Sequence, residues 1–283
     1  MSEALPTNPR PARIEVQALG PVLGAAVTGV DLAQPIGPAT AEAIRQAWFE
    51  HLVLVFPGQD LTAAHQVAFT EVFGPCQRNP DPTRKTLDGR PEVRPLVNRD
   101  GEPGPRNDFW HSDVSYAPEP VSASVLHGRE VPAVGGDTMF CNMYAAYERL
   151  SPGLKRLLAT MHAVHSARAN YLTAGLPLDQ MPPEHVHPVV RTHPAARRNA
   201  LFVDPHFTIR FADMTEAESK PLLDYVCAQA IRPENVYRHR WAGGDVVVWD
   251  NRAVMHRSVY DYGSQTRVMH RTTAQGERPF LAA

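Results

Sequence analysis

A series of short apolar segments, far apart along the chain, constrains the fold more than any other feature of the sequence. Segment 52–56 (LVLVF) ends at a Pro-Gly pair, and segment 245–249 (DVVVW) ends at a polar turn. Both have the length and the β-branched composition of buried strands. Further strand-like segments are found at 93–97, 201–203 and 267–272. Segment 14–30 is also strand-like, and glycines divide it into short strands.

Helical periodicity is found in fewer segments, and these do not alternate regularly with the strands. The spacing of apolar residues predicts helices at 39–51, 62–73 (with Thr62 as N-cap), 143–150, 153–160 and 215–230. A doubly wound parallel sheet requires regular alternation. The observed order therefore favours an α+β, mainly β fold in which an antiparallel double sheet is flanked by helices.

Two long polar and proline-rich stretches, 75–108 and 168–187, are predicted to be loops that act as lids over a site. Composition does not change elsewhere along the 283 residues, which predicts a single catalytic domain over 1–283. The opening residues 1–12 are polar and proline-rich, so we expect a flexible lead-in and no signal peptide.

Charge and cysteine content exclude several classes of protein. A formal net charge of −2, from 28 basic and 30 acidic residues, gives no field that would attract nucleic acid or a membrane surface. No segment approaches the roughly 18 apolar residues of a membrane span. The three widely spaced cysteines, Cys76, Cys141 and Cys227, predict no disulfide framework and indicate a cytoplasmic location.

His111 and Asp113 form an H-x-D triplet that suits a metal site. On or just after a strand, side chains at i and i+2 point to the same face, so an imidazole and a carboxylate occupy two coordination positions. A distant third histidine would complete the facial triad of non-haem Fe(II) oxygenases. Taken alone, the triplet is weak evidence, because a chance occurrence is expected among 13 histidines and a surface hydrogen bond between the two side chains explains it more simply.

His256 is the candidate third ligand, because a buried strand and a polar turn (246–252) would return it to the core. Arg267 and Arg271 follow in a strand-like segment, and a guanidinium binds a carboxylate through two parallel hydrogen bonds. Individually, His256 fits a satisfied core histidine and Arg267 a solvated surface arginine. Their order after the H-x-D triplet favours a metal site with an anion-binding group beside it.

Several stretches resemble the taurine dioxygenase family of Fe(II)- and 2-oxoglutarate-dependent enzymes, over nearly the whole chain. They are GVDL (29–32), NDFWHSDVSY (107–116), GGDTMFCNMYAAYERLS (135–151), HPVVRTHP (187–194), WDNRAVMH (249–256) and RVMHRTTAQGERPF (267–280). The resemblance implies a double-stranded β-helix (jelly-roll) core. It implies that His111, Asp113 and His256 bind Fe(II), that Thr138 and Arg267 bind the distal carboxylate of 2-oxoglutarate, and that O2 is consumed.

The resemblance also implies a small anionic substrate, although the expected pocket departs from that of the taurine enzymes. Arg271 and Asn107 match positions that bind or face the taurine sulfonate. Asn79 stands where those enzymes have a histidine, and Asn170-Tyr171 replaces a Ser-Phe pair. The expected substrates are therefore alkylsulfonates such as taurine, sulfate esters or aryloxyalkanoates, hydroxylated next to a heteroatom with release of succinate and CO2.

Three other functions fit parts of the pattern. An amino-acid hydroxylase of a biosynthetic pathway would use the same scaffold. A zinc hydrolase would use the same three ligands but leaves Thr138 and Arg267 without a role. A non-catalytic jelly-roll binding protein would be expected to have lost a ligand, and none is missing. For the assembly, the family predicts a homo-oligomer, either a dimer or a tetramer.

Overall fold

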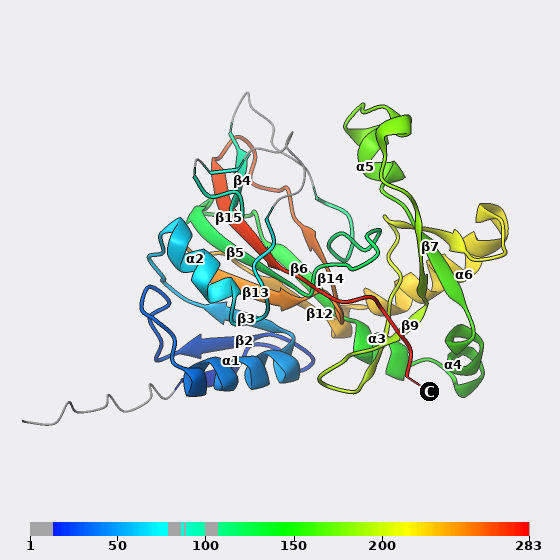
Figure 1. Cartoon of the computed structure of the whole chain (residues 1–283), viewed down its shortest axis with the longest axis horizontal. Helices are drawn as coiled ribbons and strands as arrows, with labels where there is room; N and C mark the ends of the chain where they lie inside the picture. The colour runs from blue at the N-terminus through cyan, green and yellow to red at the C-terminus, as the bar shows by residue number, and fades with distance from the viewer. Residues whose placement is uncertain (1–13, 79–85, 88, 100–106, 283) are drawn as a thin grey trace, which may run out of the picture.

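The computed structural model describes residues 14–78, 86–87, 89–99 and 107–282 (Figure 1). The predicted lead-in at 1–12, Asn79 and parts of the 75–108 stretch lie outside these residues.

A seven-stranded sheet forms the larger half of the core, with the strand order β1-β2-β3-β13-β5-β15-β4. Its pairs are antiparallel except β2–β3. The strands are β1 (Glu15–Ala18), β2 (Ala25–Thr28), β3 (Val53–Phe56), β4 (Arg94–Asn98), β5 (Ala123–Glu130), β13 (Val246–Asp250) and β15 (Arg267–Ala274). Every residue of β3 and β13 is buried, which explains why the sequences of these two strands are apolar without alternation.

A three-stranded antiparallel sheet, β12-β6-β14, packs against one face of the large sheet. Its strands are β6 (Thr138–Asn142), β12 (Val236–His239) and β14 (Val254–Ser258). Phe140 of this sheet lies 5.6 Å from Trp249 of the large sheet, measured between ring centroids. Two packed, mainly antiparallel sheets form the predicted jelly-roll architecture.

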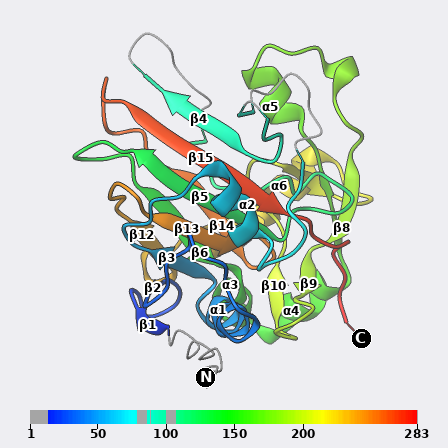
Figure 2. The same cartoon turned by 60° about the vertical axis from the view of Figure 1, so that its left-hand side comes forward.

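The first two helices of the chain cover the other face of the large sheet, and the others lie beside the smaller sheets (Figures 1 and 2). They are α1 (Pro38–His51), α2 (Ala63–Thr70), α3 (Met143–Glu148), α4 (Pro152–Ala159) and α6 (Glu216–Ala230). Thr62 is the N-cap of α2 as predicted, because its hydroxyl accepts the His65 backbone N–H at 3.2 Å. Among the described helices, none is long and apolar enough to cross a membrane.

The prediction of a loop at 168–187 is wrong for most of that stretch. It contains α5 (Arg168–Thr173), a 3-10 turn η1 (Leu178–Gln180) and β8 (His185–Pro188). Strand β8 joins β7 (His162–His165) and β11 (Thr208–Phe211) in a further small sheet. No residue of α5 is buried, so the helix lacks the apolar periodicity that identified the others.

The strand predicted at 201–203 lies two residues earlier. It is β10 (Asn199–Leu201), which pairs with β9 (Val190–Thr192) in a two-stranded sheet.

Candidate metal centre

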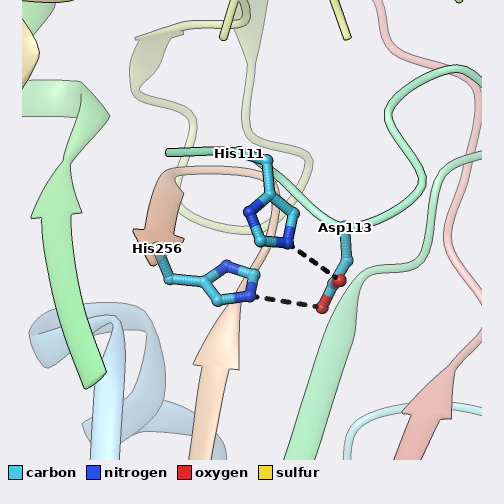
Figure 3. Close-up of side chains that lie close together, drawn as sticks. All are labelled: His111, Asp113 and His256. Atoms are coloured by element: carbon cyan, nitrogen blue, oxygen red, sulfur yellow. Dashed lines mark ion pairs between the residues drawn. The ribbon is translucent and has the colours of Figure 1, made fainter. Parts of the chain in front are cut away.

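His111, Asp113 and His256 converge and are buried (Figure 3). Asp113 Oδ1 lies 3.7 Å from His111 Nε2, and Asp113 Oδ2 lies 3.9 Å from His256 Nε2. One ligand atom from each residue lies within 4.8 Å of the others. The interpretation of the H-x-D triplet as a surface hydrogen bond is therefore wrong.

Backbone pairing between distant segments positions the two histidines. His111 and His256 form an antiparallel bridge in which each N–H donates to the carbonyl of the other, at 3.0 and 2.9 Å. His256 lies on β14, to which the turn after β13 returns the chain, as the sequence predicts. Asp113 instead begins a turn, and the next residue, Val114, has a φ of 54°. The side chains of His111 and Asp113 thus converge because a β-bridge is followed by a turn. The alternation of side chains along a strand, which the sequence suggested, does not place them on one face.

The hydrogen bonding of His111 leaves a nitrogen lone pair directed into the cluster. Its Nδ1 lies 2.9 Å from the carbonyl oxygen of Phe109, which can only accept, so Nδ1 carries a proton and Nε2 is the nitrogen that can bind a metal. Burial, and then the nearby His111, hold the pKa of His256 well below its usual range, so the His256 ring is neutral at neutral pH. A nitrogen lone pair that faces a carboxylate in a buried site is stabilised by a cation between the two groups. Two imidazoles and a carboxylate are a donor set for a divalent transition metal.

Asp113 stays ionised although it is buried. Burial alone would raise the pKa of its carboxyl group, but the charge of Arg271 and a hydrogen bond from Ser124 lower it below its usual range. Arg271 Nη1 lies 3.1 Å from Oδ1, and Ser124 Oγ donates to Oδ2 at 2.6 Å. The third ligand is therefore an anion at neutral pH.

Thr138 pairs with the strand that carries His256, and Arg267 contacts the turn that precedes Thr138. Thr138, on β6, pairs with Ser258, two residues after His256 on β14. Arg267 is 4% exposed, and its Nε donates to the carbonyl of Gly136 at 3.1 Å. Gly136 has a φ of +72°, and a Cβ there would lie 3.3 Å from Arg267 Cδ, so glycine permits both the turn and the close approach.

Arg267 and Thr138 can both donate hydrogen bonds to an anion. Arg267 Nη2 is buried and, within the described part of the chain, has no acceptor. Thr138 Oγ1 accepts from Trp241 Nε1 at 3.0 Å, which leaves its own hydrogen for another acceptor. Burial lowers the pKa of Arg267, yet an arginine side chain remains charged at neutral pH. A buried cation with a free donor fits a carboxylate such as that of a 2-oxo acid.

The residues predicted to contact the substrate occupy different surroundings. Arg271 forms the ion pair with Asp113 and is largely buried, with 12% of its side chain exposed. The Asn107 carbonyl accepts the Ser258 backbone N–H at 2.8 Å, so this residue lies beside β14. Asn79 lies outside the described residues.

Asn170, on α5, is linked to the candidate ligand His111 through His206 and Phe109. Its Oδ1 lies 2.7 Å from His206 Nε2, and the His206 ring stacks on Phe109 with centroids 3.4 Å apart. The Phe109 carbonyl in turn accepts from His111. The Tyr171 hydroxyl donates to a backbone carbonyl nine residues further along the chain, at 3.1 Å. In both overall views α5 and β4 lie at the top of the molecule, with β4 to the left of α5 (Figures 1 and 2).

Ser124 and Asn251 also contact Asp113, and the sequence did not identify them. Asn251 Oδ1 accepts the Asp113 backbone N–H at 3.2 Å. A polar residue in the turn directly after a buried strand is the signal that would have identified Asn251. Ser124 lies in the apolar strand β5, where a single hydroxyl gives little signal on its own.

Comparison with known proteins shows the family to which the chain belongs. The family model described as "Taurine catabolism dioxygenase TauD, TfdA family" matches residues 15–273. An α-ketoglutarate-dependent sulfate ester dioxygenase of Pseudomonas putida is 36% identical over 289 residues, covering 98% of this chain and 94% of the relative. An alkylsulfatase of Acinetobacter baylyi is 34% identical over 281 residues, covering 94% and 86%. The crystal structure of a taurine dioxygenase from Burkholderia xenovorans has a TM-score of 0.82 at 34% identity, covering 94% of this chain and 90% of that one.

The resemblance inferred from the sequence is confirmed, and the chain belongs to the TauD, TfdA family of dioxygenases.

Proposed function

We propose that this chain is an Fe(II)- and 2-oxoglutarate-dependent dioxygenase that hydroxylates a small sulfate ester at the carbon next to the ester oxygen. The observation that carries the proposal is the convergence of three buried metal ligands with Arg271 Nη1, which lies 3.1 Å from Asp113. A candidate metal site and a guanidinium that could bind an anion thus lie side by side. The sulfate ester dioxygenase and the alkylsulfatase among its relatives favour sulfate esters over the sulfonates and aryloxyalkanoates that also fit the sequence.

The ligand set of His111, Asp113 and His256 suits Fe(II), because two imidazoles and one carboxylate leave coordination positions open. Zinc accepts the same donors, but a zinc hydrolase gives no role to the buried Arg267 cation or to the Thr138 hydroxyl. Bound iron, together with 2-oxoglutarate and O2, supplies the oxidising power. Binding, orientation and exclusion of water are left to the side chains.

Arg267 and Thr138 are proposed to bind the distal carboxylate of 2-oxoglutarate. Trp241 fixes the Thr138 oxygen by donating to it, so the Thr138 hydrogen is directed to a ligand. Arg271 is proposed to bind the sulfate group of the substrate. Its contact with Asp113 uses one of five N–H donors, which leaves the others for anionic oxygens.

Asn107, Tyr171 and Asn79 are proposed to line the remainder of the substrate pocket, and the segments 75–108 and 168–187 to exclude water from it. The hydrogen bond between Asn170 and His206 supports a lid role for α5, because it ties this exposed helix to the segment that precedes His111.

The overall reaction balances with one O2 per turnover. One oxygen atom enters succinate as 2-oxoglutarate loses CO2, and the other becomes a hydroxyl group on the substrate carbon that carries the sulfate. The C–O bond to sulfate then breaks as the new hydroxyl loses its proton, which gives an aldehyde and sulfate.

Succinate formation across a substrate panel tests the proposal. The panel contains alkyl sulfate esters, taurine and other sulfonates, aryloxyalkanoic acids and amino acids, each with Fe(II), 2-oxoglutarate and O2. We expect the highest rate with a sulfate ester, with sulfate and succinate released in equal amounts. Succinate with amino acids alone would favour the biosynthetic hydroxylase, and no iron-dependent succinate with any compound would contradict the proposal.

We further propose one catalytic domain, a cytoplasmic location and a homo-oligomeric assembly. All three cysteines lie among the described residues and none is in a disulfide, which supports a reducing compartment. Light scattering on the purified protein measures the assembly, and a mass of one chain would contradict the expected dimer or tetramer.

A further inference from the structure

A chain of hydrogen bonds connects the large sheet to the Asp113 carboxylate. Ser124 Oγ donates to Asp113 Oδ2 at 2.6 Å, and Asn251 Nδ2 donates to Ser124 Oγ at 3.0 Å. Asn251 Oδ1 accepts the Trp249 indole N–H at 3.0 Å and the Asp113 backbone N–H at 3.2 Å. All four residues are buried.

The direction of these hydrogen bonds is unambiguous. The Trp249 indole and the Asp113 backbone N–H can only donate, so the Asn251 amide oxygen faces them and its NH2 group faces Ser124. Ser124 accepts from this NH2 group, and its single hydrogen is left for Asp113 Oδ2. A hydroxyl that donates to a buried carboxylate at this length is among the stronger hydrogen bonds in proteins.

The backbone of Asn251 is fixed on both sides. Its N–H donates to the Ser122 carbonyl at 2.9 Å, and its carbonyl accepts from Ser112 Oγ at 2.7 Å. The preceding residue, Asp250, binds the Arg252 guanidinium through both carboxylate oxygens, each at 2.7 Å. The turn after β13 therefore cannot shift without breaking several buried contacts.

Arg271 acts on the same carboxylate from the opposite side, through Oδ1 at 3.1 Å. Because the terminal torsion of an aspartate is soft, a carboxylate held only by Arg271 can rotate into a two-point pair with the guanidinium. Such a pair would compete with a metal for both oxygens. Ser124 opposes this rotation because it holds Oδ2.

We propose that Ser124 and Asn251 are positioning residues that hold the Asp113 carboxylate in its metal-binding orientation against the pull of Arg271. The inference rests on the proposed metal site. Partners that orient a metal ligand without touching the metal typically change metal affinity by about 10- to 100-fold when they are removed.

Mn(II) titration of the full-length protein tests the inference without turnover. The EPR signal of free aqueous Mn(II) reports binding, and Mn(II) shares the preference of Fe(II) for oxygen and nitrogen donors. Ser124→Ala is expected to raise the Mn(II) Kd by about 10- to 100-fold. Ser124→Thr, which keeps the hydroxyl, is expected to stay close to wild type.

Ser122→Ala is the matched control. It also removes a buried serine hydroxyl, two residues away, but that hydroxyl donates to the Gln275 carbonyl at 2.7 Å and not to Asp113. We expect its Mn(II) Kd to stay within about twofold of wild type, because the lost bond shares no partner with the metal site.

The outcomes separate the two proposals. The positioning role is overturned if Ser124→Ala binds Mn(II) as tightly as wild type. It is also overturned if Ser122→Ala or Ser124→Thr loses as much Mn(II) affinity as Ser124→Ala does. Neither result contradicts the metal site. Wild-type protein that binds Mn(II) no better than His111→Ala overturns the metal site itself. If Ser124→Ala is unfolded without metal, Ser124→Cys, of nearly the same shape but with a weak donor, replaces it with the same expected loss.

Discussion

Replacing Arg267 by methionine is expected to stabilise the ligand-free protein while it removes 2-oxoglutarate binding. The guanidinium is 4% exposed, its Nε bonds the Gly136 carbonyl, and its Nη2 has no acceptor in the described structure. Burial lowers the pKa of Arg267, so its surroundings disfavour the charge when no anion is bound. Methionine is unbranched and flexible, and it occupies much of the same volume without a charge.

The two effects have opposite signs because only a bound anion compensates for the buried cation. Exchanging buried charges for apolar groups of similar volume stabilises proteins by about 1 to 4 kcal/mol in favourable cases. The lost hydrogen bond to Gly136 removes about 1 kcal/mol of that gain, so we expect a net gain of about 1 kcal/mol. Truncating one partner of a buried charge pair costs about 2 to 5 kcal/mol of binding. Affinity for 2-oxoglutarate is therefore expected to fall by at least about 30-fold.

Urea unfolding measures the first effect, and calorimetric titration of 2-oxoglutarate into the Mn(II)-loaded protein measures the second. Arg198→Met is the control, because this arginine is 45% exposed and pairs with Glu148 at the surface. We expect neither effect in the control. A ligand-free Arg267→Met that is less stable than wild type by more than about 2 kcal/mol would refute the reasoning about the buried charge. An unchanged affinity for 2-oxoglutarate would refute the assignment of Arg267.

Arg271→Ala is expected to raise the KM for the best sulfate ester at least about 10-fold in the succinate assay, and an unchanged KM would contradict the anion-binding role. Burial and the neighbouring His187 lower the pKa of His165 to about 3, so below pH 6.5 the unfolded chain takes up a proton that the folded protein does not. The stability from this residue is complete above pH 6.5 and falls by about 1.4 kcal/mol per pH unit on acidification towards 3. His165→Gln should flatten the pH dependence of urea unfolding by that slope, and an identical slope would be inconsistent with a neutral, buried His165. Asp250→Ala leaves Arg252 buried without its two-point partner and is expected to lower the unfolding free energy by about 3 to 5 kcal/mol, whereas a loss below about 1 kcal/mol would speak against this pair.

Burial on both faces explains which strands the sequence predicts well. Strands β3 and β13 lie inside the large sheet, with helices on one face and the small sheet on the other. All their residues are therefore buried, and all but Asp250 are apolar. Helices α2 and α6 carry capping threonines, Thr62 and Thr215, which mark their first turns. Helix α5 buries nothing, so neither periodicity nor a cap distinguishes it from a loop.

The three candidate metal ligands could be predicted from the sequence because their residue types and order are unusual together. Asp113 reaches its partners through a turn with a positive φ at Val114, which no periodicity encodes. The contacts of Ser124 and Asn251 with Asp113 exist only because β5 and the turn after β13 lie side by side, 127 residues apart in sequence. Long-range hydrogen bonds of this kind depend on the tertiary fold, and single residue types do not predict them.

The weak visible absorption of an iron–2-oxoglutarate chelate tests the central claim most directly, because it requires both groups to be bound at one site. Fe(II) and 2-oxoglutarate are added without O2 to wild type, His111→Ala and Arg267→Met. We expect the band in wild type, none in His111→Ala, and in Arg267→Met a band only at much higher 2-oxoglutarate concentration. A wild-type protein without the band at saturating ligand, or a His111→Ala variant with the full band, would contradict the assignment of His111, Asp113 and His256 as the iron ligands.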